Sequence, residues 1–183
     1  MKTRQLAASL AVLLAGFAAS TAAADTRRFP VQGGAAMILA VPDSWRDETK
    51  PNYYPNRPVT IVFTPAGGAD FVVHVSPVLT GTRIPRPGPG EVHDGVGKSA
   101  DALKSQSVEP ELKIVDFRAG DIFGAYYAAT AREPKPGEYK HLTQGTFVLA
   151  DLVVNFSIYT REDRDGVVEK ALDIMKAARR EAR

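Results

Sequence analysis

Apolar side chains alternate with other side chains along most of the chain, with a period of two residues. Two segments show the alternation clearly, VTIVFT at 59–64 and FVVHVS at 71–76. A two-residue period is typical of a β-strand, and the glycines of PAGGAD between them suit a hairpin turn. The pair therefore predicts a β-hairpin. Further strands are predicted at residues 37–41, 112–118, 122–132, 142–149 and 152–160.

Two segments have helical spacing instead. Val92, Val96, Ala100 and Leu103 recur every three or four residues, with Asp94 as the expected N-cap. The second apolar stripe lies at 167–178, and the basic residues at its end are interpreted as a solvated helix terminus. Strands with short connections and two helices predict an α+β fold, an antiparallel sheet with helices packed on it. Val62 and Val72, opposite the main stripe, suggest a sheet covered on both faces.

The N-terminus has the pattern of a secretory signal peptide. Lys2 and Arg4 precede an uncharged, mostly apolar run, and three alanines at 22–24 stand before Asp25. The run is shorter than the roughly 20 apolar residues that a membrane-spanning helix needs. We therefore expect a signal peptide at 1–24, a single mature domain at 25–183 without a transmembrane segment, and a periplasmic or secreted location.

The charge balance argues against nucleic acid as a partner. The full chain has 23 basic and 21 acidic residues, and loss of Lys2 and Arg4 with residues 1–24 would make the two counts equal. A nucleic-acid-binding domain usually carries a basic excess. The chain also has no cysteine, so its core must be stable without disulfides.

Trp45, the only tryptophan, follows an apolar segment in the sequence MILAVPDSW. Pro42 lacks an N–H and should end a strand, and Asp43 and Ser44 favour a turn. We expect Trp45 to fold back against the sheet as a buried plug rather than to stack on a ligand, since tryptophan is highly buried on average.

The order of these elements resembles the PsbP-like family. The segments that carry the resemblance are MILAVPDSW, VTIVF, FVVHVS, LKIVDF, GAYYAATA and LVVNFSIYT, with a helix in the middle and another at the end. The family takes its name from an extrinsic subunit of the oxygen-evolving complex and includes many small exported bacterial proteins. The resemblance implies an α/β/α sandwich and brings no shared catalytic residues, and we do not transfer the photosystem role.

No recognisable catalytic motif appears in the sequence. His74, His93 and His141 are isolated, and Glu91, His93 and Asp94 make a poor metal-binding set. There is no Gly-x-Ser-x-Gly motif, and the carboxylates fall mainly in turns and on the last helix. We therefore expect no metal and no cofactor, and an enzyme is the less favoured interpretation.

Loops remain as candidate binding elements. The segment 46–58 carries Tyr53 and Tyr54, and the proline-rich segment 80–90 carries Arg83 and Arg86. Tyrosine and arginine often anchor interfaces, and arginine can bind a carboxylate through two hydrogen bonds. The hypothesis is that both loops lie at one end of the sheet and bind one acidic protein partner.

Three functional interpretations follow. The leading one is an exported, soluble, non-catalytic accessory or binding protein. The alternatives are a hydrolase or metal-dependent enzyme with a site assembled from distant residues, and a small-ligand carrier with a pocket between sheet and helix. An enzyme should show converging polar groups with shifted pKa values. A carrier should show an apolar cavity, and a partner-binding protein an exposed aromatic patch near arginine.

Overall fold

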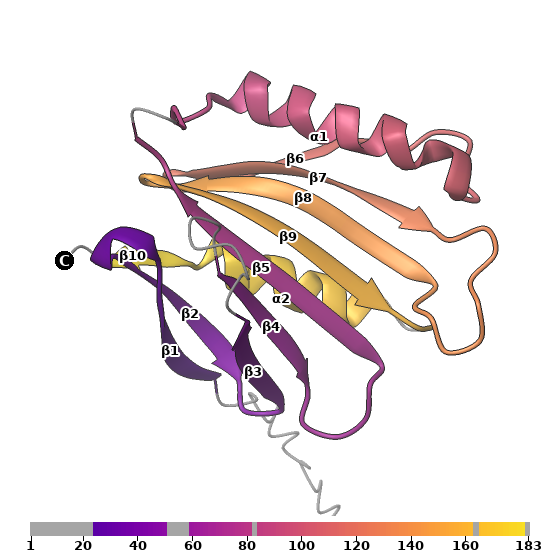
Figure 1. Ribbon diagram of the computed structural model, residues 1–183, viewed down its shortest axis with the longest axis horizontal. Helices are drawn as coiled ribbons and strands as arrows, with labels where there is room; N and C mark the ends of the chain where they lie inside the picture. Colours follow the sequence, from indigo (N-terminus) through magenta and orange to yellow (C-terminus); the bar gives the residue numbers. More distant parts are fainter. Residues whose placement is uncertain (1–23, 51–58, 82–83, 163–164, 182–183) are drawn as a thin grey trace, which may run out of the picture.

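Seven strands form one antiparallel sheet that carries both helices. The computed structural model describes residues 24–50, 59–81, 84–162 and 165–181. The strands are β3 (Trp45–Lys50), β4 (Thr60–Pro65), β5 (Phe71–Leu79), β6 (Val115–Ala119), β7 (Ile122–Thr130), β8 (His141–Leu149) and β9 (Leu152–Thr160). Their order is β3-β4-β5-β9-β8-β7-β6, and each neighbouring pair is antiparallel (Figure 1). The predicted β4–β5 hairpin is confirmed.

Three strands form a second antiparallel sheet. They are β1 (Ala24–Pro30), β2 (Ala36–Pro42) and β10 (Arg179–Glu181), with β2 between the other two. A single 3₁₀ turn, η1 (Gln32–Gly34), connects β1 to β2. The predicted signal peptide lies outside the described residues except for Ala24, and cleavage after Ala24 would leave the rest of β1 intact.

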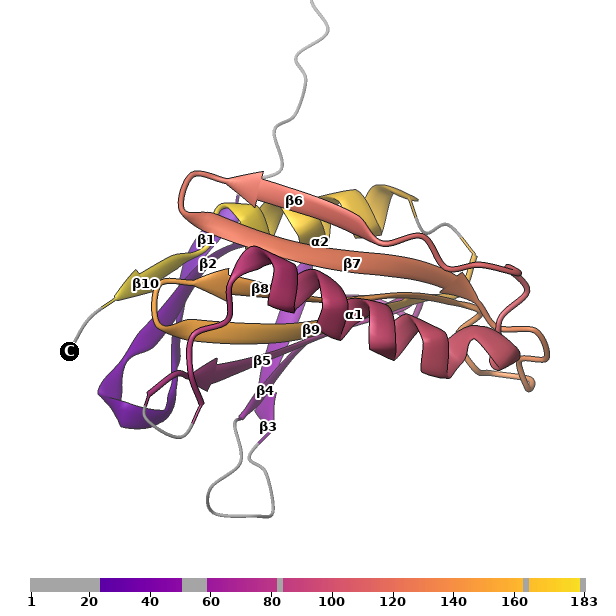
Figure 2. The same ribbon diagram turned by 90° about the horizontal axis from the view of Figure 1, so that it is seen from above.

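The helices α1 (Pro89–Leu103) and α2 (Asp165–Lys176) lie on opposite faces of the large sheet (Figure 2). The larger core joins one sheet face, including Phe63, Val73 and Phe156, to α2 and the small sheet. The second core joins α1 to the other face, mainly at β7 and β8. The predicted α+β architecture is confirmed. Neither described helix has the length and apolar character to cross a bilayer.

Both predicted helices are present, with corrected ends. The residues Val92, Val96 and Ala100 are buried as expected. Asp94 is not the N-cap, because α1 begins five residues earlier at Pro89. The Gly88 N–H donates to the Glu91 carboxylate over 2.7 Å, which closes the first turn instead. A 3₁₀ turn, η2 (Lys104–Gln106), extends the other end.

The basic C-terminal segment is not a solvated helix end. Helix α2 ends at Lys176, and the chain then forms β10 against β2. Arg180 is held by both oxygens of Asp151, with Nε to Oδ1 at 2.8 Å and Nη2 to Oδ2 at 2.9 Å. Its partner lies in the β8–β9 turn, which no sequence spacing indicated.

Trp45 is buried, as predicted, with only 8% of its surface exposed. Its ring lies 4.7 Å from the Phe71 ring and 6.3 Å from the Phe63 ring, measured between centroids. Trp45 nevertheless starts strand β3 rather than a loop. The expected loop at 46–58 is therefore a strand as far as Lys50, and residues 51–58 lie outside the described part of the chain.

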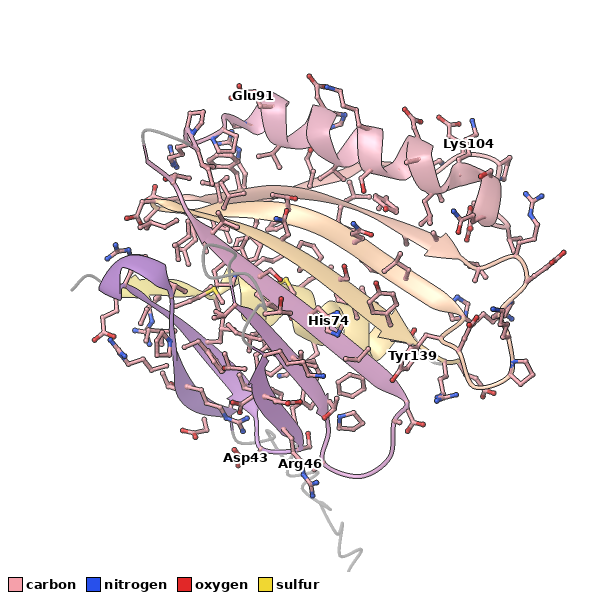
Figure 3. All side chains as sticks on the ribbon, viewed as in Figure 1. Asp43, Arg46, His74, Glu91, Lys104 and Tyr139 are labelled. Carbon is pink, nitrogen blue, oxygen red and sulfur yellow. The ribbon has the colours of Figure 1, made fainter. Side chains whose placement is uncertain are left out.

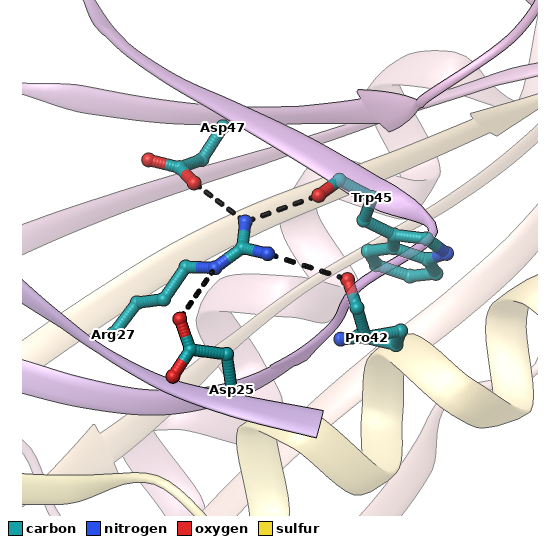
Figure 4. Close-up of polar contacts among 5 residues, drawn as sticks. All are labelled: Asp25, Arg27, Pro42, Trp45 and Asp47. Atoms are coloured by element: carbon teal, nitrogen blue, oxygen red, sulfur yellow. Dashed lines mark hydrogen bonds and ion pairs between the residues drawn. The ribbon is translucent and has the colours of Figure 1, made fainter. Parts of the chain in front are cut away.

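Arg27 on β1 fixes the turn that carries Trp45 (Figure 4). Its Nη1 donates to the Trp45 carbonyl over 3.0 Å and to the Asp47 carboxylate over 2.6 Å. Its Nη2 reaches the Pro42 carbonyl at 3.5 Å. The guanidinium thus joins the small sheet to the first strand of the large one.

Candidate functional site

A half-open polar pocket of about 330 Å³ lies between α1 and the large sheet. The expected helices on both faces of the sheet are present, and α1 covers its face mainly over β7 and β8. The side chains of β5 and β9 on this face include His74, Ser76, Asn155 and Ser157. Figure 3 shows His74 on the part of the sheet that α1 leaves open.

Strand register arranges the pocket floor in two rows. One row crosses the sheet as His74, Ser157, Gln144 and Tyr127, each opposite the next on neighbouring strands. The other row runs Ser76, Asn155, Thr146 in the same way. Residues i and i+2 of a strand share a face. The two rows therefore contain one pair of polar residues on each of β5, β8 and β9, and Tyr127 on β7 is the seventh residue.

Hydrogen bonds hold the floor in one arrangement. The Tyr127 hydroxyl donates to Gln144 Oε1 over 3.2 Å, and Gln144 Nε2 donates to the Ser99 hydroxyl over 3.4 Å. Ser99 and Tyr127 hydroxyls lie 3.4 Å apart, which completes a ring between α1 and the sheet. In the second row, Thr146 Oγ1 donates to Asn155 Oδ1 over 2.8 Å.

The ionisable groups of the pocket are uncharged at neutral pH. Burial lowers the pKa of His74 below its usual 6.5, and the positive charge of Lys50 lowers it further. Burial raises the pKa of the Tyr127 phenol above 10.0. The pocket therefore presents a neutral imidazole and neutral hydroxyl and amide groups.

The lowered pKa of His74 should appear in the pH dependence of stability. In the unfolded chain His74 takes up a proton near pH 6.5, whereas in the folded protein it does so only at a lower pH. The neutral His74 therefore contributes its full stability above pH 6.5. The free energy of unfolding should decrease as the pH falls from 6.5 to the pKa of His74 in the folded protein. Urea unfolding of the wild type and His74→Gln across this range should show a weaker pH dependence in the variant. An NMR titration that gives His74 a pKa of 6.5 or higher would contradict this expectation.

The described lining residues of the pocket do not form a hydrolase site. His74 lies opposite Ser157, but no described lining residue is an acid that could orient the imidazole. Across the described ranges, no group of three or more histidine and acidic residues could hold a metal ion. Glu91 is used as a helix cap, and His93 Nδ1 lies 3.0 Å from the Asp116 carboxylate on β6.

Comparison with known structures identifies the fold. The solution structure of cyanobacterial PsbP (CyanoP) from Synechocystis is 14% identical, with a TM-score of 0.51, over 90% of this chain and 97% of that one. The crystal structure of LpqN, involved in cell envelope biogenesis of Mycobacterium tuberculosis, is 18% identical, with a TM-score of 0.50, over 86% and 92%. The chain has a PsbP-like fold. Its sequence matches no protein-family model and no curated protein.

In this PsbP-like fold, Arg86 lies in the segment before α1, and its side chain packs against the protein surface. Its Nε donates to the Ala150 carbonyl over 2.8 Å, and its guanidinium lies 5.4 Å from the centre of the Phe123 ring. Tyr53, Tyr54 and Arg83 lie outside the described residues. The shared loop surface proposed for these four residues therefore remains a prediction.

Sequence reasoning missed the polar rows on the sheet of this PsbP-like fold. Their signal was present as pairs at i and i+2 in otherwise apolar strands, His74 with Ser76, Gln144 with Thr146, and Asn155 with Ser157. Each pair alone resembles the solvent-facing side of an ordinary strand. Only the register of β5, β8 and β9 shows that the pairs adjoin one another.

Proposed function

We propose that this chain is an exported, non-catalytic binding protein that holds an uncharged, hydroxyl- or amide-bearing ligand in the pocket beside α1. The observation that carries the proposal is the chemistry of the pocket. Within the described residues, its lining contains serine, threonine, asparagine, glutamine, tyrosine and a neutral histidine, and no lysine, arginine, aspartate or glutamate.

The uncharged lining of the pocket contrasts with the rest of the chain. Charged residues make up 24% of the sequence, and the nearby edge strand β3 carries Arg46, Asp47, Glu48 and Lys50 on its exposed positions. Hydroxyl and amide groups can both donate and accept hydrogen bonds, as the hydroxyls of a sugar do. The described lining residues offer a charged ligand no opposite charge to replace its lost hydration.

The position of the pocket agrees with the small-ligand carrier interpretation, but its polarity does not. The pocket lies between sheet and helix as expected for a carrier, although an apolar cavity was expected there. The polar groups converge with shifted pKa values, as an enzyme would require, but no acid accompanies His74 among the described lining residues. These features favour binding over catalysis.

An extracytoplasmic accessory role is consistent with the fold and with the predicted signal peptide. LpqN, one of the structural neighbours, is described as involved in cell envelope biogenesis. Proteins of an envelope meet neutral glycans, which carry the hydroxyl and amide groups that this pocket could bind. We propose an envelope location and a neutral glycan ligand for this chain.

A ligand titration tests the proposal. N-acetylglucosamine and its β-1,4-linked disaccharide serve as neutral probes, with binding followed through amide chemical shifts. Changes should map to β5, β8, β9 and the α1 residues around Ser99. The double variant Thr146→Val with Asn155→Leu should weaken binding about tenfold, because it removes hydrogen bonds worth roughly 0.5–1.5 kcal/mol each.

The double variant removes both members of one hydrogen-bonded pair, so neither partner is left unsatisfied and stability should change little. Thr49→Val, at an exposed position of β3, is the matched control and should bind the probes as the wild type does. Absence of shifts at the pocket for both probes, up to their solubility limits, would contradict the proposed ligand class.

A further inference from the structure

A second cleft, of about 810 Å³, lies at the end of the molecule where β10 and the β8–β9 turn meet, at the left of Figure 1. Five basic residues line it. They come from the segment before α1, from β6, from the last turn of α2 and from β10, and they are Arg86, Arg118, Lys176, Arg179 and Arg180. The fold thus gathers cations from both halves of the sequence.

Most of this positive charge is uncompensated within the described structure. Asp151 neutralises Arg180 through two short contacts. Lys176 has only a long contact, 3.9 Å, to Asp173. No carboxylate in the described ranges pairs with Arg118 or Arg179, and among the described residues of the cleft lining Asp121 is the single acid.

Besides Arg180, which Asp151 holds, two more of the cations are held in place by the protein. Arg86 is fixed by the Ala150 carbonyl and lies over Phe123. The Lys176 ammonium lies 6.0 Å from the centre of the Phe117 ring. Side chains that are already ordered lose less entropy when a ligand binds. Gathering like charges is unfavourable without an anion, and the rest of the chain has no comparable excess because basic and acidic residues nearly balance.

We infer that this cleft binds a phosphate-bearing ligand. Four of the five cations are arginines, whose planar forks match phosphate oxygens through paired hydrogen bonds. A phosphate group carries up to two charges and three terminal oxygens, so several guanidiniums can share it. A single carboxylate has one charge and two oxygens and would leave most of these cations unmatched. The phosphate can come from a free small molecule or from a lipid headgroup.

The site is distinct from the neutral pocket beside α1, since the two share no lining residue. It also extends the earlier expectation about Arg86, because Arg86 contributes to an anion site here together with residues of β6, α2 and β10. The partner inferred is a phosphate group rather than an acidic protein.

Isothermal titration calorimetry of the full mature chain with pyrophosphate tests this inference. The variant Arg118→Gln with Arg179→Gln removes the two exposed arginines that have no described acidic partner, so folding should be preserved. We expect at least a tenfold loss of affinity in the variant and weaker binding by the wild type as salt increases. Arg46→Gln, an exposed arginine on β3, is the matched control and should leave affinity unchanged.

Two further arms identify the source of the phosphate. Co-sedimentation with phosphatidylglycerol vesicles but not phosphatidylcholine vesicles, lost in the double variant, would support a lipid headgroup. Pyrophosphate binding without vesicle binding would support a free ligand. Binding of a polyglutamate peptide in place of both phosphate probes, or no binding of any probe, would overturn the inference. The Thr146→Val, Asn155→Leu variant should retain pyrophosphate binding, which separates this test from that of the neutral pocket.

Discussion

Replacement of Trp45 by alanine is expected to lower the free energy of unfolding by about 3–5 kcal/mol, the range for deleting a large buried aromatic side chain. The indole fills the space between the β2–β3 turn and the rings of Phe63 and Phe71. Urea unfolding of the variant and the wild type would measure the difference. Trp45→Phe should cost much less, because it retains an aromatic ring in the same space.

Fluorescence gives an independent check on Trp45, since it is the only tryptophan. A buried indole emits at short wavelength and is protected from iodide. Easy quenching by iodide in the folded protein, or a Trp45→Ala variant as stable as the wild type, would contradict the role of a buried plug.

Gly145→Ala should be the second strongly destabilising substitution, costing about 3 kcal/mol, the upper part of the range for overpacking. A Cβ at Gly145 would collide with the Ala125 carbonyl oxygen, a backbone atom, and would lie 2.6 Å from Tyr126 Cβ and 2.7 Å from the Phe156 ring. These neighbours belong to β7 and β9, on either side of β8, so the central sheet would have to shift. Thermal and urea unfolding would measure the loss.

Gly97→Ala on α1 is the matched control for this glycine substitution. Nothing lies within 4 Å of a Cβ built there, and alanine favours a helix over glycine by roughly 0.5–1 kcal/mol. The control should therefore be slightly more stable than the wild type. Equal stability of Gly145→Ala and the wild type would show that β8 tolerates a side chain at this position.

The alternating pattern predicted the strands whose burial alternates, and it failed for strands that have no apolar stripe. After Trp45, strand β3 is exposed at every position, so no pattern marked it as a strand. Its hydrogen-bonding partner β4 determines its conformation. The same holds for β10, where β2 supplies the pairing and Asp151 binds Arg180. The strand conformation of these two segments is determined by tertiary contacts and not by their own composition.

The candidate sites were less predictable than the fold for a similar reason. The polar pocket depends on three strand pairs coming into register, and the basic cleft depends on four segments meeting at one end of the sheet. Sequence spacing describes one element at a time. Arg86 was identified from its loop, but Arg118 and Arg179 become its neighbours only through the topology.

The central pairing of β5 with β9 has a consequence for when the protein can fold. These adjacent strands, at 71–79 and 152–160, join distant parts of the chain, so the large sheet cannot close until residue 160 has left the ribosome. Pairings between distant segments slow folding, because the entropy of loop closure is lost before the contacts form. A newly made chain with this topology therefore stays unfolded for longer during synthesis, and an unfolded chain is the form that the proposed export would require.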